Sequence, residues 1–206
     1  MPRHAYAFEP NGTKRLELSW GLFWKNFTIS LDGQQVATLQ PADVKQGHEV
    51  PLPDGTTLRV QLKRGFANAG LEVLRNGQPL PGTSTDPATQ VKTAGYVLYF
   101  LGAVHSLVGA VALAFDVRIL LKLGFGLSTI GFGFVFALSG FFTLKRSQAA
   151  LITGITLYAL DYVVGLVWSL AAGGRPSLGG IGVRILFIVI MARGIGGIRA
   201  LKARAP

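Results

Sequence analysis

The 206-residue chain contains no cysteine, which excludes disulfide bonds, thiolate metal sites and cysteine nucleophiles. Acidic residues are scarce in its second half, where residues 93–206 hold two Asp/Glu against ten Lys/Arg. Residues 1–92 are nearly balanced, with eight Asp/Glu and ten Lys/Arg. The net charge of +10 is therefore concentrated in residues 93–206, and the first half lacks the basic stripe that nucleic-acid binding requires. We expect no nucleic-acid partner.

Recognisable motifs of enzymes are also missing. The sequence has no H-E-x-x-H, no P-loop, no intact G-x-G-x-x-G and no paired-carboxylate pattern. His4 and His48 have no partners at the spacing of metal ligands, so ordinary surface histidines are the simpler interpretation. We therefore predict that the protein is not an enzyme, and that it holds no metal and no cofactor.

Four long apolar runs occupy the second half of the chain. About 20 apolar residues are needed to cross a bilayer as a helix, and each run reaches that length. A four-helix transmembrane bundle is therefore predicted for residues 94–206, with the lipid bilayer as its surroundings. The predicted spans cover residues 94–115, 121–144, 149–172 and 178–198.

The charges between the spans predict the orientation of the protein. The first residues lack the long apolar run of a secretory signal, and four spans place both termini on one side. That side carries more Lys and Arg, which the positive-inside rule assigns to the cytoplasm. The terminal side would hold Lys92, Lys145, Arg146, Arg199, Lys202 and Arg204, and the opposite side Asp116, Arg118, Lys122 and Arg175.

Residues 1–80 have the pattern of a small all-β domain. Three dipeptides typical of two-residue hairpins, Asp32-Gly33, Asp54-Gly55 and Asn76-Gly77, separate stretches in which apolar and polar residues alternate. About six to eight antiparallel strands fit this pattern, as a sandwich or a half-barrel. The Pro-rich and Ser/Thr-rich residues 81–93 are expected to form a semi-extended linker into the first span.

One aromatic cluster stands out in this domain, between Trp20 and Lys25. Filling of the domain core is one interpretation of these rings. Two others remain open, because Trp is also favoured at the head-group layer of membranes and in surfaces that dock on a partner.

Glycines recur at intervals of seven in the first two spans. Gly95, Gly102 and Gly109 form one series in the first span. A second series of three follows in the second span and consists of Gly126, Gly133 and Gly140. Small residues on one stripe of a helix let neighbouring backbones approach closely in lipid. We therefore expect a compact bundle.

A few polar residues lie deep within the spans. At 1.5 Å per residue, His105 and Asp161 lie about 17–18 Å, and Arg184 about 21 Å, from the cytoplasmic ends of their spans. Ionisable groups at this depth should face inward and pair. They are either a structural Asp–Arg pair with a hydrogen-bonded histidine, or a proton relay, ion path or polar ligand site. The predicted midplane polar cluster consists of His105, Ser128, Thr129, Tyr158, Asp161 and Arg184.

Two segments of the chain resemble known families. The stretches Phe27–Gly33 and Leu71–Leu80 are similar to the β-sandwich repeat of Fas apoptotic inhibitory molecules, which implies an interaction module without a ligand. Leu157–Asp161, followed by Ala192–Ile195, resembles a helical hairpin of uncharacterised bacterial four-span membrane proteins. That resemblance implies a bacterial cytoplasmic membrane and brings no known activity.

These observations favour a non-catalytic membrane protein with an accessory, assembly or sensing role. Its cytoplasmic β domain would bind a protein partner, or the chain would form a homo-oligomer. The alternative is a small transporter or proton-coupled channel that uses the midplane polar cluster.

Overall fold

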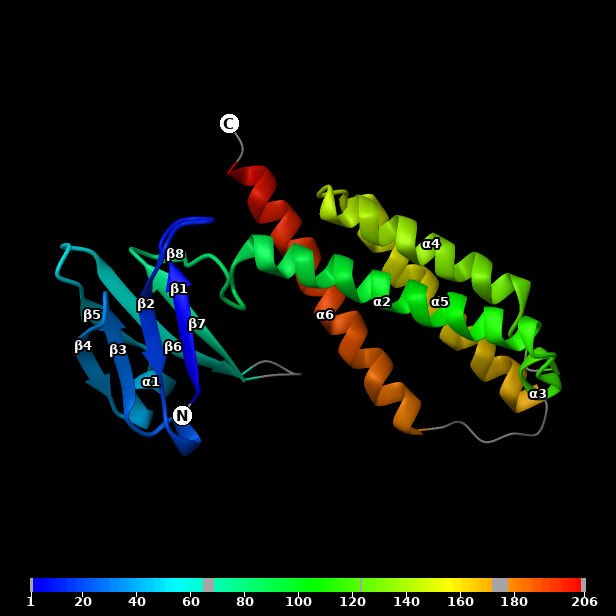
Figure 1. Ribbon diagram of the computed structural model, residues 1–206, viewed down its shortest axis with the longest axis horizontal. Coiled ribbons are helices and arrows are strands. Elements are labelled where there is room, and N and C mark those ends of the chain that lie inside the picture. Colours follow the sequence, from blue (N-terminus) through cyan, green and yellow to red (C-terminus); the bar gives the residue numbers. More distant parts are fainter. Residues whose placement is uncertain (1, 65–68, 123, 172–177, 205–206) are drawn as a thin grey trace. The chain divides into compact units, whose positions relative to one another are not determined.

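The computed structural model describes residues 2–64, 69–122, 124–171 and 178–204 (Figure 1). The chain divides into two compact units, Met1–Thr89 and Gln90–Pro206. The first is called the β unit and the second the helical unit, and each is described by itself.

The described part of the β unit consists of two antiparallel four-stranded sheets. Their strand orders are β1-β2-β3-β4 and β5-β6-β7-β8 (Figure 1). The predicted all-β class is confirmed, in its sandwich form. The elements are β1 (Arg3–Ala7), β2 (Lys14–Ser19), β3 (Phe27–Leu31), β4 (Gln34–Leu39), the short helix α1 (Pro41–Gln46), β5 (His48–Pro51), β6 (Thr57–Arg64), β7 (Ala69–Arg75) and β8 (Gln78–Pro79).

Alternating apolar side chains from both sheets form one core. Leu16 and Leu18 of β2 are fully buried, as are Ile29 of β3 and Leu58 and Val60 of β6. Burying one such side chain contributes about 1.5–3 kcal/mol relative to leaving it in water. Because side chains on a strand alternate between its two faces, the polar residues between them point outward.

Two of the three predicted hairpin dipeptides form two-residue turns. Asp32-Gly33 joins β3 to β4 and Asn76-Gly77 joins β7 to β8, and all four residues have positive φ, as type I′ turns require. The prediction is wrong for Asp54-Gly55, where only Gly55 has positive φ. There the Asp54 carboxylate accepts hydrogen bonds from the amide and hydroxyl of Thr56, which stabilises a longer connection between β5 and β6.

The helical unit contains four helices, among the described residues, that are long and apolar enough to cross a membrane. This supports a multi-pass membrane protein and confirms the predicted four-helix bundle. The helices are α2 (Pro87–Ala114), α3 (Arg118–Lys122), α4 (Leu127–Leu144), α5 (Gln148–Ala171) and α6 (Leu178–Ala203), of which α3 is too short to span.

Three predicted boundaries differ from the structure. The fourth span was predicted to end at Ile198, whereas α6 continues to Ala203. α2 begins at Pro87, so the residues predicted as the end of a semi-extended linker are helical; the Asp86 carboxylate accepts hydrogen bonds from the Ala88 and Thr89 amides and caps this start. The helix of the second span begins at Leu127, six residues after the predicted start at Leu121. Gly124 has a φ of +85°, which is incompatible with a continuous α-helix through this residue. Two predictions fall on residues that the structure does not describe: the end of the third span at residue 172, and the position of Arg175 in the loop after it.

The two glycine series face each other. Gly95 lies opposite Gly140, Gly102 opposite Gly133 and Gly109 opposite Gly126, so α2 and α4 run antiparallel with their backbones in contact. A methyl group added to Gly102 would lie 2.8 Å from the carbonyl oxygen of Gly133. The expected close packing through small residues is therefore present.

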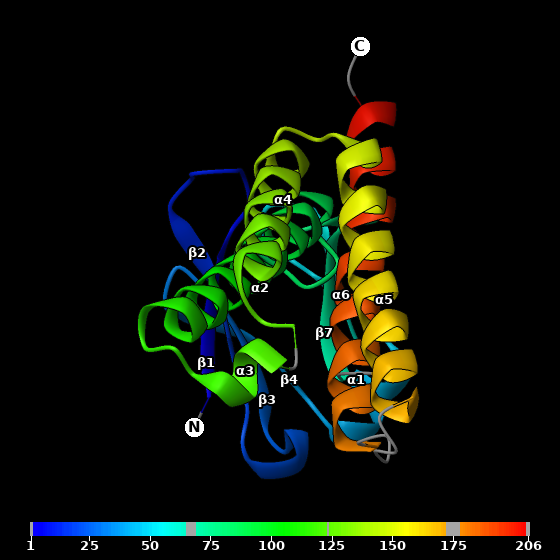
Figure 2. The same ribbon diagram turned by 90° about the vertical axis from the view of Figure 1, so that its right-hand side faces the viewer.

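α5 and α6 form a second antiparallel pair and run side by side in Figure 2. A core of buried side chains joins the two pairs, with Leu98 of α2, Phe136 of α4, Tyr158 of α5 and Met191 of α6 among them. Many large apolar side chains on the outer faces are exposed, as lipid-facing residues would be.

Candidate functional site

Three of the six residues predicted to form the midplane polar cluster meet at one carboxylate oxygen. Arg184 Nη1 of α6 donates to Asp161 Oδ2 of α5 at 3.1 Å. His105 Nε2 of α2 lies 4.0 Å from the same oxygen. Residues far apart in the sequence are thus brought together by the depths of their helices, as the sequence predicted.

Arg184 has further partners on α5. It donates to the main-chain carbonyl of Tyr158 at 3.3 Å. Its guanidinium carbon lies 5.1 Å from the centre of the Tyr158 ring and 4.8 Å from that of Tyr162. Residues four apart share one face of a helix, so the two rings flank the same cation. The charge of Arg184 is therefore stabilised by a carboxylate, a carbonyl and two aromatic faces.

Tyr162 was not predicted as part of this group. Its hydroxyl is buried and has no hydrogen-bond partner within the described residues. Its position four residues after Tyr158, on the same face of the helix, is the sequence signal that could have identified it. We call His105, Tyr158, Asp161, Tyr162 and Arg184 the charged cluster.

His105 is oriented by its own helix. Its Nδ1 lies 2.8 Å from the carbonyl oxygen of Leu101. A carbonyl only accepts hydrogen bonds, so Nδ1 carries a proton and Nε2 faces Asp161. A second proton, on Nε2, makes this contact attractive, whereas without it a lone pair faces the carboxylate. The contact between His105 and Asp161 therefore depends on protonation.

Ser128 and Thr129 lie at the height of His105 but do not join the charged cluster. Gly102 faces Gly133 and Gly109 faces Gly126, which places both hydroxyl residues level with the segment of α2 that holds His105. Their hydroxyls instead bond the carbonyl of Gly124, at 3.4 and 3.5 Å, in the turn that precedes α4. They stabilise the start of this helix.

The ion pair in the charged cluster is only partly exposed to solvent. The side chains of Asp161 and Arg184 are 26% and 29% exposed, and that of His105 is 16% exposed. With His105 neutral, one negative and one positive charge cancel, which lowers the cost of placing them within a membrane. In the described residues no three His, Cys, Asp or Glu side chains group to hold a metal ion.

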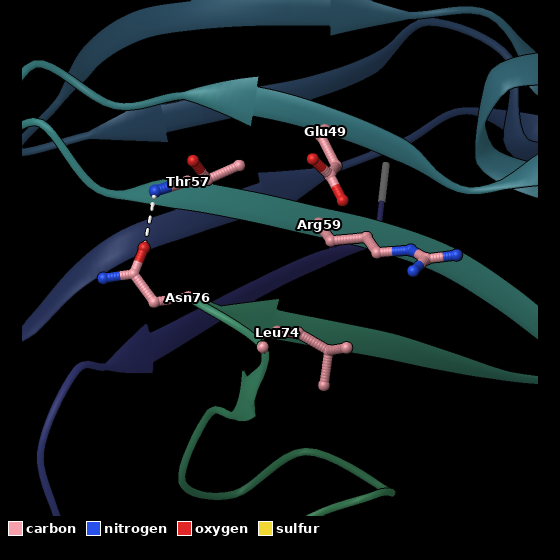
Figure 3. A pocket seen from close by; sticks show the side chains of 6 residues that line it. Glu49, Thr57, Arg59, Leu74 and Asn76 are labelled. Atoms are coloured by element: carbon pink, nitrogen blue, oxygen red, sulfur yellow. Dashed lines mark hydrogen bonds between the residues drawn. The ribbon is translucent and has the colours of Figure 1, made fainter.

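A second candidate site is a hollow of about 280 Å³ on the outer face of the second sheet (Figure 3). Glu49 of β5 lies directly opposite Arg59 of β6, which in turn lies opposite Leu74 of β7. Asn76 closes one end by accepting a hydrogen bond from the Thr57 amide at 2.9 Å. Both charges and an apolar side chain are therefore presented side by side on one sheet.

Neighbouring charges at the same end of the sandwich are already paired. Arg75 Nη2 lies 2.8 Å from Asp54 Oδ2, and the hydrogen bonds from Thr56, together with Arg75, lower the pKa of Asp54. By contrast, Glu49 and Arg59 make no ion pair with the described residues. Both side chains are exposed on the outer face of the sheet.

No protein-family model, curated protein or solved structure matches the chain. The two resemblances noted in the sequence therefore stay predictions.

Proposed function

We propose that this protein is a non-catalytic accessory, assembly or sensing protein of a bacterial cytoplasmic membrane. In this proposal four helices anchor it, both termini are cytoplasmic, and the β unit binds a protein partner. The anchor is supported by the four apolar helices. The observation that carries partner binding is the hollow on the second sheet, where the exposed Glu49 and Arg59 make no ion pair within the described part of the chain.

The size and chemistry of the hollow favour a protein segment. At about 280 Å³ it is slightly smaller than the usual range for small-molecule pockets, and it is lined by strands rather than enclosed. A guanidinium, a carboxylate and the half-buried Leu74 lie side by side across three strands. Arg and apolar side chains at the centre of a surface are typical of protein interfaces, and the opposite charges would fix the orientation of the partner.

The charged cluster has a structural role in this proposal. Arg184 neutralises Asp161 inside the bundle and fixes how α5 and α6 align. Such a pair resists slippage of the two helices, because a shift of one turn would leave both charges unpaired in lipid.

A second candidate function is proton-coupled transport, favoured by His105. Its Nε2 faces the Asp161 carboxylate, so gain or loss of one proton changes the attraction within the charged cluster. Proton flux into liposomes that contain the purified protein tests this candidate. Flux that is present in the wild type and lost in His105→Gln would support transport, and absence of flux would exclude it.

Partner binding is tested by purification from native membranes in a mild detergent. The wild type should retain a stoichiometric protein, and Arg59→Glu should lose it because a charge at the centre of the hollow is reversed. Lys14→Glu is the matched control, since Lys14 is an exposed cation on β2 in the other sheet of the same unit. Equal retention by both variants would contradict the proposed surface. A retained protein identical to the chain itself would identify the partner as a second copy.

A further inference from the structure

The aromatic cluster between Trp20 and Lys25 is divided by the structure. Trp20 and Trp24 pack against the core of the β unit, as one interpretation of the sequence predicted. Leu22 and Phe23 do not: each is 78% exposed. Residues 21–26, called the aromatic loop, thus present two large apolar side chains together on the surface.

The aromatic loop holds this pair outward at a cost in backbone conformation. Phe23 and Trp24 have φ of +56° and +65°, a region that bulky residues rarely adopt. The Gly21 amide closes the loop with a 2.7 Å hydrogen bond to the Lys25 carbonyl. Trp20 stacks on Trp24 with ring centres 4.9 Å apart, which fixes the loop on the core. Strain that the surrounding structure enforces is characteristic of functional segments.

The chain leaves the β unit in the half of the sandwich that carries the aromatic loop. α1 contacts this loop, and the carbonyl of Gln46 in α1 accepts a hydrogen bond from Gln61 of β6. After β8 the chain runs back beside β7. There the Ser84 hydroxyl donates a hydrogen bond to the carbonyl of Leu71, and Leu71 is next in sequence to the residue of β7 that pairs with Gln61. The exit and the loop therefore lie in the same half of the sandwich.

The connection from this part of the β unit to the first predicted span is short. α2 begins at Pro87, and the first predicted span begins at Ala94, about 10 Å further along the helix at 1.5 Å per residue. So short a connection gives the loop a high effective concentration at the membrane surface. Two apolar side chains, which would hold a free domain only weakly on lipid, are then sufficient.

Charges near the aromatic loop favour an anionic surface. Lys25 in the loop and Lys45 in the adjoining α1 are both exposed. Cations beside an apolar tip are attracted to acidic head groups, while the apolar side chains enter the boundary between head groups and acyl chains. A protein interface of standard size buries about 800 Å² on each partner, more than two projecting side chains supply.

We propose that Leu22 and Phe23 insert into the membrane that the helical unit spans, with Lys25 and Lys45 against anionic lipid phosphates. The occupant of this surface is therefore lipid. The inference is independent of the proposed partner site, since that hollow lies near the opposite end of the sandwich, beside the Asn76-Gly77 turn. Insertion would hold the β unit on the bilayer and leave the hollow free to bind a protein.

The test uses the full chain, whose lack of cysteine allows single labels. Leu22→Cys is labelled with a fluorescent bimane and reconstituted in vesicles that contain phosphatidylglycerol, with or without brominated acyl chains. The matched control is Gln34→Cys, an exposed position at the other end of the sandwich. Bromolipid should quench the label at position 22 severalfold more than the label at position 34, and Phe23→Gln should reduce the quenching at position 22.

Three outcomes would overturn the proposal. Equal quenching at the two positions would show that the aromatic loop stays in water. Quenching at position 22 that Phe23→Gln leaves unchanged would show that Phe23 does not anchor the loop. A photoreactive group at position 22 that forms adducts in native membranes with a protein, and not with lipid, would assign the surface to a protein partner.

Discussion

The ion pair between Asp161 and Arg184 predicts an asymmetry between two single substitutions. In Asp161→Asn, Arg184 keeps the Tyr158 carbonyl and the rings of Tyr158 and Tyr162. In Arg184→Gln, the one charged partner that the Asp161 carboxylate keeps among the described residues is His105, at 4.0 Å. The anion therefore loses more than the cation does, and Arg184→Gln should be the more damaging change.

The magnitudes follow from these partners. Removing one member of a buried pair costs about 3–5 kcal/mol, and we expect Arg184→Gln to fall in this range. Asp161→Asn removes the charge from one hydrogen bond, and a hydrogen bond to a charged group contributes about 1.5–3 kcal/mol. Because the two rings still stabilise the Arg184 cation, we expect this substitution to cost about 1–2 kcal/mol. The double variant should be more stable than Arg184→Gln alone, because no unpaired charge remains.

Titration with dodecyl sulfate in mild-detergent micelles, followed by the helical circular dichroism signal, measures these free energies. Arg193→Gln is the matched control, since Arg193 is exposed on the same helix. It should unfold close to the wild type. The reasoning would be refuted if Asp161→Asn were the more damaging change, or if all three single variants unfolded together.

Three more changes test other parts of the structure. Gly133→Ala places a methyl group against the backbone of α2 and should cost about 1–3 kcal/mol in the same titration, whereas Gly131→Ala, which has open space, should cost nothing. An impermeant thiol reagent on intact cells should label Asp116→Cys and not Gln34→Cys, and labelling of Gln34→Cys alone would show that the predicted orientation is inverted. The lowered pKa of Asp54 stabilises the folded β unit above the unfolded pKa and stops doing so as pH falls through the folded pKa. Asp54→Asn should therefore melt below the wild type at about pH 6, with a smaller difference at about pH 3.

Features set by spacing along one helix or strand could be predicted from the sequence. Glycines seven apart predicted a stripe of small residues, and the structure places Gly102 against Gly133. Depth along each span predicted the meeting of Asp161 and Arg184, because the short connection between their helices fixes the antiparallel alignment of the pair. Alternation predicted the β class, because one face of each sheet must be buried.

Other features could not be predicted from spacing, because they depend on which of several possible partners a side chain binds, or on how strands align. Thr56 draws the Asp54 carboxylate into a local turn, which no dipeptide rule describes. Ser128 and Thr129 have the right depth, but their hydroxyls bond the nearby Gly124 carbonyl instead of the charged cluster. The hollow on the β unit brings together side chains from three strands, and its position depends on register, which the sequence did not define.

Photocrosslinking in living cells tests partner binding by the β unit most directly. A photoreactive amino acid in place of Glu49 reports on the hollow, and one in place of Gln34, which is also exposed, reports on a surface outside it. We predict one discrete protein adduct from position 49 and none from position 34. No adduct at position 49, or the same adducts from both positions, would contradict the proposed function.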